Sequence, residues 1–258
     1  MTSNDIPDQP KKVRVLIVDD DVFMRDGLSL NLSGKGFEVQ QAGDEATALA
    51  LALGEPAPEV AVIDISIPPE PQVLRWTANN FGVRLAQRIK SERPAMGIVF
   101  LSAYEYHLDG VWDMIRTGQR GLAYKLKGRR SNALIDAINK VLEGKVEIDP
   151  EVRAKRPALI DELYRLLDPE ERPWVERVLD RFPTLTPQEL RTANLLAASH
   201  NTQGIAAKLG VQRADSLIGR VYAKLGLNEL STAAPHLRQS TVLVKACMIR
   251  DFETGSMT

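Results

Sequence analysis

Acidic, hydroxyl and basic side chains stand at the ends of four apolar runs in this chain. They are Asp19 and Asp20 after residues 13–18, Asp64 at the end of residues 60–64, Ser102 after residues 98–101, and Lys125 at the end of residues 121–125. Short apolar runs of this length are typical of strands buried on both faces of a parallel sheet. Because the carboxyl ends of parallel strands meet at one edge of the sheet, we expect these five side chains to converge on one site.

The residue types at this edge indicate phosphoryl chemistry. Three carboxylates repel one another unless they share a cation, and oxygen ligands with room for water favour Mg²⁺ over zinc or copper. Lys125 adds a fixed positive charge and Ser102 adds a hydroxyl group. Such a set suits an anionic, oxygen-rich group placed covalently on Asp64, which is a phosphoryl group. Each residue alone has a commoner structural explanation, such as capping a loop.

The elements that must position these residues alternate between strand and helix. Strands are expected at residues 13–18, 39–42, 60–64, 98–101 and 121–125, and helices at residues 22–33, 44–54, 82–93, 109–117 and 131–143. This alternation predicts an α/β fold with a doubly wound, five-stranded parallel sheet.

Residues 146–184 are predicted to be a helical linker. Leu159, Leu163 and Leu166 recur at helical spacing between prolines that divide the segment into short helices. A flexible linker would carry fewer apolar residues, so this one is expected to pack on something. The alternatives are packing on the preceding domain, a dimer contact, or a relay between domains.

Residues 185–258 have the pattern of a helix-turn-helix domain. Thr186, Pro187 and Glu189 make a capping box at the start of a helix, and Gly210 breaks the chain between a second helix at 202–209 and a third at 213–225. The candidate DNA contacts on and beside the third helix are Gln212, Arg213, Ser216, Arg220 and Lys224. A solvated face would explain the charges alone, but together with the turn and the capping box they favour DNA binding. The apolar tail at 242–246 is expected to form an extra helix.

Composition and charge narrow the class of protein. The chain has 258 residues, 44% of them hydrophobic and 26% charged, which predicts a soluble globular protein with one large or two ordinary domains. No apolar run reaches the length of a membrane span, and the lone Cys247 excludes an internal disulfide, so a cytoplasmic protein is expected. Residues 1–128 contain 14 Lys and Arg against 17 Asp and Glu, whereas residues 185–258 contain 8 against 5. A partner that carries phosphates would therefore meet the basic C-terminal part.

Residues 12–145 resemble the flavodoxin-like receiver domain of two-component response regulators. The resemblance lies in the acidic pair after the first strand, Asp64 after the third, Ser102-Ala103 after the fourth and a lysine after the fifth. It implies that Asp64 accepts phosphate from a histidine kinase. It also implies that Mg²⁺ is held by Asp20, Asp64 and the backbone carbonyl of Ser66, with Asp19 assisting. The run Asp19-Asp20-Asp21 allows two pairings, and we take Asp19–Asp20 because the family's acids directly follow the apolar strand.

Some positions depart from the receiver pattern. The family usually has a glycine about eight residues after its phosphorylated aspartate, whereas here Gly82 follows Asp64 by eighteen. Counted from Lys125, the aromatic position three residues earlier is Leu122, with Tyr124 displaced by two, and Leu126 replaces the usual proline. Tyr104, two residues after Ser102, is expected to shield the phosphoryl group from water.

Residues 185–227 resemble the LuxR/NarL-type DNA-binding domain. The shared features are Leu-Thr-Pro-x-Glu at 185–189, Ile205-Ala206 with Leu209, and Lys224-Leu225. The resemblance implies that the third helix enters the major groove of DNA. The turn before that helix looks two residues short, with Gln212 alone where three residues are usual.

The sequence therefore predicts a phosphorylation-controlled transcriptional regulator. It is expected to bind double-stranded DNA, to act as a phosphoacceptor and not as an enzyme, to be a homodimer when active, and to have no membrane partner. The expected domains are a receiver at 1–128 with a closing helix to about 145, a linker at 146–184, and the helix-turn-helix domain at 185–258. The alternative is a signalling adaptor whose helix-turn-helix contacts protein.

Overall fold

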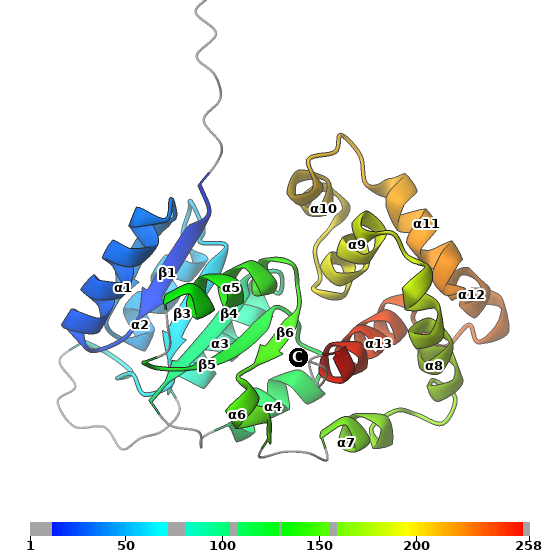
Figure 1. Ribbon diagram of the computed structural model, residues 1–258, viewed down its shortest axis with the longest axis horizontal. Helices are drawn as coiled ribbons and strands as arrows, with labels where there is room; N and C mark the ends of the chain where they lie inside the picture. The colour runs from blue at the N-terminus through cyan, green and yellow to red at the C-terminus, as the bar shows by residue number, and fades with distance from the viewer. Residues whose placement is uncertain (1–11, 72–80, 104–107, 129–130, 155–158, 255–258) are drawn as a thin grey trace, which may run out of the picture.

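A six-stranded parallel sheet forms the first half of the protein, in the strand order β2-β1-β3-β4-β5-β6 (Figure 1). The computed structural model describes residues 12–71, 81–103, 108–128, 131–154 and 159–254. The strands are β1 (Arg14–Val18), β2 (Glu38–Ala42), β3 (Val60–Asp64), β4 (Gly97–Ser102), β5 (Leu122–Leu126) and β6 (Val146–Ile148). Because β1 lies between β2 and β3, the strand order reverses there, which is where open α/β sheets place their sites.

Helices cover both faces of the sheet. They are α1 (Val22–Gly34), α2 (Glu45–Leu53), α3 (Phe81–Glu92), α4 (Asp109–Arg116), α5 (Ser131–Leu142) and α6 (Pro150–Ala154). Val15 and Ile17 of β1 share a buried cluster with Leu32 of α1 and Ile138 of α5. Leu16 belongs to a second cluster that includes residues of α2, α3 and α4. Alternate strand residues thus face opposite helix layers, which confirms the doubly wound fold.

The prediction of five strands misses β6. Its residue Val146 pairs in parallel with Leu122 of β5, so the sheet extends into the segment predicted to be linker. Only three residues form this strand, and a run that short gives no reliable periodicity in a sequence.

The second half of the protein is helical. Its elements are α7 (Leu159–Arg165), α8 (Arg172–Arg181), α9 (Pro187–Ala197), α10 (Thr202–Leu209), α11 (Asp215–Leu225), α12 (Leu230–Ala233) and α13 (Gln239–Thr254), with 3₁₀ turns at Phe182–Thr184 and Leu227–Glu229. The extra helix expected in the tail is confirmed as α13. Linker helices α7 and α8 both pack on α13, so the C-terminal part of the same chain covers the linker.

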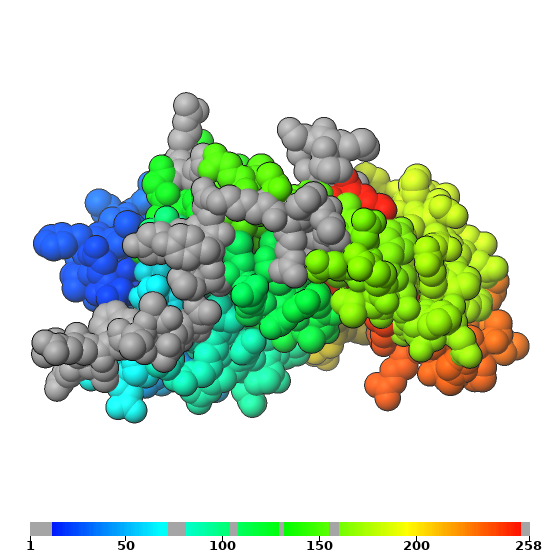
Figure 2. Space-filling view, turned by 90° about the horizontal axis from the view of Figure 1, so that it is seen from below, coloured from blue at the N-terminus to red at the C-terminus, as the bar shows by residue number. Residues whose placement is uncertain are grey.

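The two halves lie at opposite ends of an elongated molecule. In Figures 1 and 2 the sheet half runs from blue to green, the helical half from yellow to orange, and the red helix α13 lies between them. Within the described ranges, no helix combines the length and the apolar character that crossing a membrane requires.

Candidate functional site

Three carboxylates gather where β1 and β3 end. Val18 pairs with Ile63, so Asp19, the residue after β1, and Asp64, the last residue of β3, come next to each other at the edge of the sheet. One carboxylate oxygen from each of Asp19, Asp20 and Asp64 lies within 4.8 Å of the others. Asp19 is buried, Asp64 is half-buried and Asp20 is exposed. The predicted acidic cluster therefore forms, with one side open to solvent.

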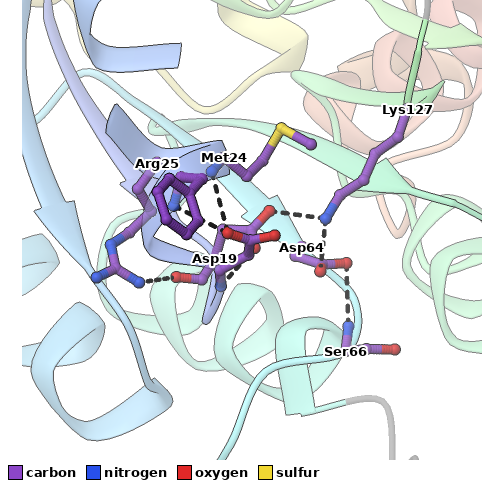
Figure 3. A network of polar contacts seen from close by, with 8 residues as sticks. Asp19, Met24, Arg25, Asp64, Ser66 and Lys127 are labelled. Atoms are coloured by element: carbon purple, nitrogen blue, oxygen red, sulfur yellow. Dashed lines mark hydrogen bonds and ion pairs between the residues drawn. The ribbon is translucent and has the colours of Figure 1, made fainter. Parts of the chain in front are cut away.

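The lysine of this site is Lys127 (Figure 3). Its Nζ lies 2.7 Å from Asp19 Oδ2 and 2.8 Å from Asp64 Oδ2. The choice of Lys125 was wrong, because that side chain instead pairs with Glu147 of β6 at 2.8 Å. The reason is the length of β5, which continues through Leu126, so that Lys125 lies within the strand and Lys127 is the first residue after it. The Lys127 N–H then donates to Ser102 O at 2.7 Å.

Asp21, the third acid of the run, has a structural role. It is the N-cap of α1, and its carboxylate accepts hydrogen bonds from the N–H groups of Phe23 at 2.9 Å and Met24 at 3.2 Å. A carboxylate used in this way satisfies helix N–H groups that otherwise lack partners. This position agrees with the choice of Asp19 and Asp20 as the acidic pair.

The electrostatics of the cluster favour a cation. Burial raises the pKa of Asp64, against the hydrogen bond and charge of Lys127, and the neighbouring Asp19 raises it further. Burial also raises the pKa of Asp20. For Lys127, burial acts to lower the pKa, but the bonds to Asp19 and Asp64 outweigh it and raise the pKa overall. Three carboxylates against one ammonium leave an excess of negative charge, which suits a hard cation with oxygen ligands.

Ser102 and Tyr124 connect the site to β4 and β5. Ser102 is buried at the end of β4, and Tyr124 is fully buried and hydrogen-bonded to Ser102. Burial raises the pKa of Tyr124. Counted from Lys127, Tyr124 occupies the aromatic position of the receiver pattern, so the departure predicted at Leu122 is corrected. The residue after the lysine is then Gly128.

Ser66 of the loop after β3 and Gly82 of the first turn of α3 lie against the site. The Ser66 N–H donates to Asp64 Oδ1 at 3.2 Å, whereas the metal-binding role of its carbonyl stays a prediction. Gly82 is so close that a Cβ there would lie 2.1 Å from Asp64 O. It therefore packs against the site despite the longer loop. Tyr104 and residues 72–80 lie outside the described residues, and the shielding role of Tyr104 stays a prediction.

The helix-turn-helix is formed by α10, a turn and α11. Gly210 ends α10 in the left-handed conformation, with φ of 65°. Helix α11 begins at Asp215 and not at Arg213, because the chain turns once more before it. Gln212, Arg213 and Ala214 therefore stand between Val211 and the helix, and the predicted shortening of the turn is corrected.

Two of the basic side chains proposed for DNA are tied to α9. Lys224 Nζ lies 2.7 Å from Glu189 Oε2, and Arg220 Nε lies 3.8 Å from Glu189 Oε1. The capping box of Thr186 and Glu189 is confirmed. The pKa of Glu189 is lowered to about 2. The hydrogen bond from Lys224 is the largest cause, and the hydrogen bond from the Thr186 N–H is the second. Arg213 instead pairs with Asp215 at 3.2 Å, with 84% of its side chain exposed.

Ser216 and Gln212 complete the predicted set, and both are exposed. The structure thus places all five predicted DNA contacts on one part of the surface, beside and along α11. The first three in the sequence lie at its N-terminal end, where recognition helices contact base edges.

Comparisons with known proteins cover both halves of the chain. Residues 15–125 match the response regulator receiver domain. The probable transcriptional regulatory protein NarL of Mycobacterium tuberculosis (strain ATCC 25618 / H37Rv) is 25% identical over 239 residues, which cover 91% of this chain and 98% of that protein. The transcriptional regulatory protein DegU of Brevibacillus brevis is 25% identical over 231 residues, 86% of this chain and 91% of that protein. A CheY-like receiver domain protein from Methanospirillum hungatei JF-1 covers 56% of this chain and 99% of its own, with 24% identity and a TM-score of 0.43.

Proposed function

We propose that this chain is a two-component response regulator with a receiver domain and a LuxR/NarL-type output domain, and that phosphorylation of Asp64 controls its binding to double-stranded DNA. The observation that carries the proposal is the arrangement of Asp64, Lys127 and Ser102 around one sheet edge, in a chain that also presents an exposed helix α11. This chain aligns with nearly the whole length of relatives that are named transcriptional regulatory proteins, which favours this function over that of a signalling adaptor.

Asp64 is suited to be the nucleophile. One of its carboxylate oxygens would form the new P–O bond while the P–N bond of a phosphohistidine breaks, with its electron pair going to the imidazole. In this structure Lys127 holds Asp64 and Asp19 at once. In the phosphorylated protein it would pair with a phosphoryl oxygen and offset part of the negative charge of the phosphoryl group.

Asp19, Asp20 and Asp64 are suited to hold Mg²⁺, with the Ser66 carbonyl as a further oxygen ligand. The fit rests on three carboxylate oxygens within 4.8 Å of one another beside a single lysine. When bound, Mg²⁺ supplies positive charge to the oxygens of the transferring group. The residues themselves orient Asp64: the Ser66 N–H fixes Oδ1 and Lys127 fixes Oδ2.

The output domain would read DNA with the N-terminal end of α11. Arg213 is the most exposed of the predicted basic side chains, and its guanidinium can form two parallel hydrogen bonds to a guanine. Lys224 and Arg220, held beside Glu189, would contribute charge near the phosphates. The proposed partners are a histidine kinase and a DNA duplex bound by a homodimer, and the chain itself would act as a phosphoacceptor and not as an enzyme.

The test has two parts. Acetyl phosphate with Mg²⁺ should add one phosphoryl group to the protein, and Asp64→Asn should abolish it. The phosphorylated protein should then bind a selected duplex with an affinity that falls steeply with salt. Undiminished labelling of Asp64→Asn would refute the acceptor, and the absence of salt-dependent duplex binding would refute the output function.

A further inference from the structure

Arg120 is an arginine whose side chain lies wholly inside the protein. It stands two residues before β5, and its side chain is 0% exposed. Asp64 ends β3, so the amino end of β5 and the phosphorylation site belong to opposite edges of the parallel sheet. An arginine side chain does not lose its proton in a protein, so Arg120 keeps its positive charge at this buried position.

The guanidinium group of Arg120 is only partly matched by acceptors. Its Nη2 lies 2.8 Å from Oδ2 of Asp251 on α13, and the Asp251 side chain is 7% exposed. Its Nε and Nη1 have no hydrogen-bond partner among the residues that the structure describes. A buried donor without an acceptor costs about 1–3 kcal/mol, and more where the donor is charged. Where no side chain serves as acceptor, native proteins supply water or an ion.

Asn194 of α9 adds a third donor to the same cluster. Arg250 Nη2 donates to Asp251 Oδ1 at 2.9 Å and to Asn194 Oδ1 at 2.5 Å. Because the Asn194 oxygen accepts this bond, the amide nitrogen Nδ2 points elsewhere as a donor. Asn194 is 1% exposed, and Nδ2 has no partner within the described part of the chain. Donors from the turn before β5 and from α9 thus lie on either side of Asp251.

Positive charge exceeds negative charge in this cluster. Asp251 divides one negative charge between the guanidinium groups of Arg120 and Arg250. Lys90, which is 5% exposed, brings a third cation and donates to the carbonyl of Arg120 at 2.5 Å. A buried charge is stable only where an opposite charge and hydrogen bonds compensate for the loss of water. The cluster therefore calls for negative charge as well as for hydrogen-bond acceptors.

A small anion supplies both. It accepts hydrogen bonds from several N–H groups at once and adds negative charge. A water molecule also accepts from these donors, but it adds no charge and brings two O–H donors of its own that need acceptors. Arg120 Nε, Arg120 Nη1 and Asn194 Nδ2 are all closed off from solvent, which favours a compact ion over a large organic ligand.

We propose that Arg120 and Asn194 bind a small inorganic anion, of the size and charge of chloride, where the turn before β5 meets α9 and α13. The ion would accept hydrogen bonds from Nε and Nη1 of Arg120 and from Nδ2 of Asn194. It would be a resident part of the folded chain and would hold these three segments together. The site does not involve phosphorylation of Asp64, so it holds or fails independently of the proposed function.

Thermal unfolding of the full chain tests the site in solution. Chloride should replace gluconate, a bulky anion, at constant ionic strength. The Tm of the parent should rise with chloride concentration, because a ligand that binds only the folded state stabilises it by mass action. Arg120→Met removes two of the three donors and should abolish this rise. Arg165→Met removes the same charge from an exposed position on α7 and should keep the rise of the parent.

A second variant decides the question even if Arg120→Met fails to fold. Asn194→Asp keeps the size of the side chain and replaces the third donor with a negatively charged oxygen. It should abolish the rise with chloride and should unfold at a higher temperature than the parent when chloride is absent, because its carboxylate provides the missing charge. A Tm of the parent that is independent of chloride, or a rise that persists in Asn194→Asp, would overturn the proposal.

Bromide gives the position of the ion. In crystals of the parent grown with sodium bromide, an anomalous scattering peak should lie within hydrogen-bond distance of Arg120 Nε and Asn194 Nδ2. Electron density there without an anomalous signal would identify a buried water molecule, for which the neighbouring Gln119 Oε1 offers an acceptor, and the anion would be refuted. A bromide peak without any effect of chloride on the Tm would indicate an adventitious ion only, which also refutes the proposal.

Discussion

Lys127 Nζ bridges Asp64 Oδ2 at 2.8 Å and Asp19 Oδ2 at 2.7 Å, so one ammonium group spans the ends of β1 and β3. Lys125, two residues earlier, serves another purpose, because its Nζ lies 2.8 Å from Glu147 on the far side of β5. The two lysines form a matched pair for experiment: Lys125 lies near the end of β5, Lys127 is the first residue after it, and only Lys127 contacts Asp64.

Replacing Lys127 should slow phosphorylation far more than replacing Lys125. Lys127→Ala removes a fixed charge from the transferring group, and loss of one such stabilising group costs about 100-fold or more in rate. Lys125→Ala should stay within a few-fold of the parent. Incorporation of phosphate from acetyl phosphate, followed on phosphate-affinity gels, measures both rates. Equal slowing of the two variants would contradict the assignment of Lys127.

Metal binding should depend on Asp20 and not on Asp21. Asp20→Asn removes a charged oxygen ligand from the cluster and should weaken Mg²⁺ binding by about 10-fold or more. Asp21→Asn changes the charge of the neighbouring residue, but asparagine caps a helix as well as aspartate does, so α1 should keep its start. Calorimetric titration with MgCl₂ compares the two. Similar losses of affinity would show that net charge alone, and not ligation, governs binding.

Sequence-specific DNA binding should depend most on Arg213. Arg213→Ala should cost about 1–3 kcal/mol on the selected duplex and little on a scrambled one, if the guanidinium contacts a base in the major groove. Lys224→Ala and Arg220→Ala should weaken both duplexes alike, because Glu189 holds these side chains away from the first turn of α11. Fluorescence anisotropy at one fixed salt concentration makes the comparison. A loss of specificity in Lys224→Ala with none in Arg213→Ala would reverse the proposed orientation.

The buried Lys90 should make stability depend on pH. The pKa of Lys90 is lowered to about 7 from its ordinary value of 10.5, mainly by burial and to a smaller extent by the positive charge of Arg120. Its Nζ donates to Arg120 O at 2.5 Å and to Pro94 O at 3.0 Å. The unfolded chain binds this proton more readily, so the contribution of Lys90 to stability is lost as pH falls from about 10.5 to about 7.

Lys90→Met tests this contribution. Between pH 7 and pH 9 the free energy of unfolding of the parent should rise relative to that of the variant, by at most about 1.4 kcal/mol per pH unit. Urea unfolding at several pH values gives both curves. Lys35→Met, at an exposed position after α1, serves as the control and should run parallel to the parent. If the free energy of unfolding of Lys90→Met changed with pH in parallel with that of the parent, the prediction would be wrong.

Replacing two glycines by alanine should change the stability of the protein in opposite directions. A Cβ at Gly82 would lie 2.1 Å from Asp64 O, so Gly82→Ala should destabilise the receiver by about 1–3 kcal/mol through overpacking. Gly219 has no atom within 4 Å of such a Cβ and lies inside α11, so Gly219→Ala should stabilise the protein by about 0.5–1 kcal/mol. Chemical unfolding of both variants decides the signs.

The sequence by itself determined the acidic half of the site and the class of fold. Residues 60–64 are apolar up to a single aspartate, and a strand of such residues, buried on both faces, can place Asp64 only at its end. The capping box at Thr186 and Glu189 likewise predicted the start of α9, because both partners are local in the chain. Features that depend on residues close together in the chain, or on continuous apolar runs, can be predicted from the sequence alone.

The tertiary structure decided the features that depend on distant partners. Strand β5 ends after Leu126 because that residue pairs with Ser102 of β4, and this pairing makes Lys127 and not Lys125 the lysine of the site. Strand β6 is too short to form alone and exists because Leu122 pairs with Val146. The ion pair between Arg120 and Asp251 joins two halves of the chain that no local pattern connects. In each case the energy that selects the arrangement comes from hydrogen bonds and burial between segments far apart in the sequence, so only the folded chain could specify it.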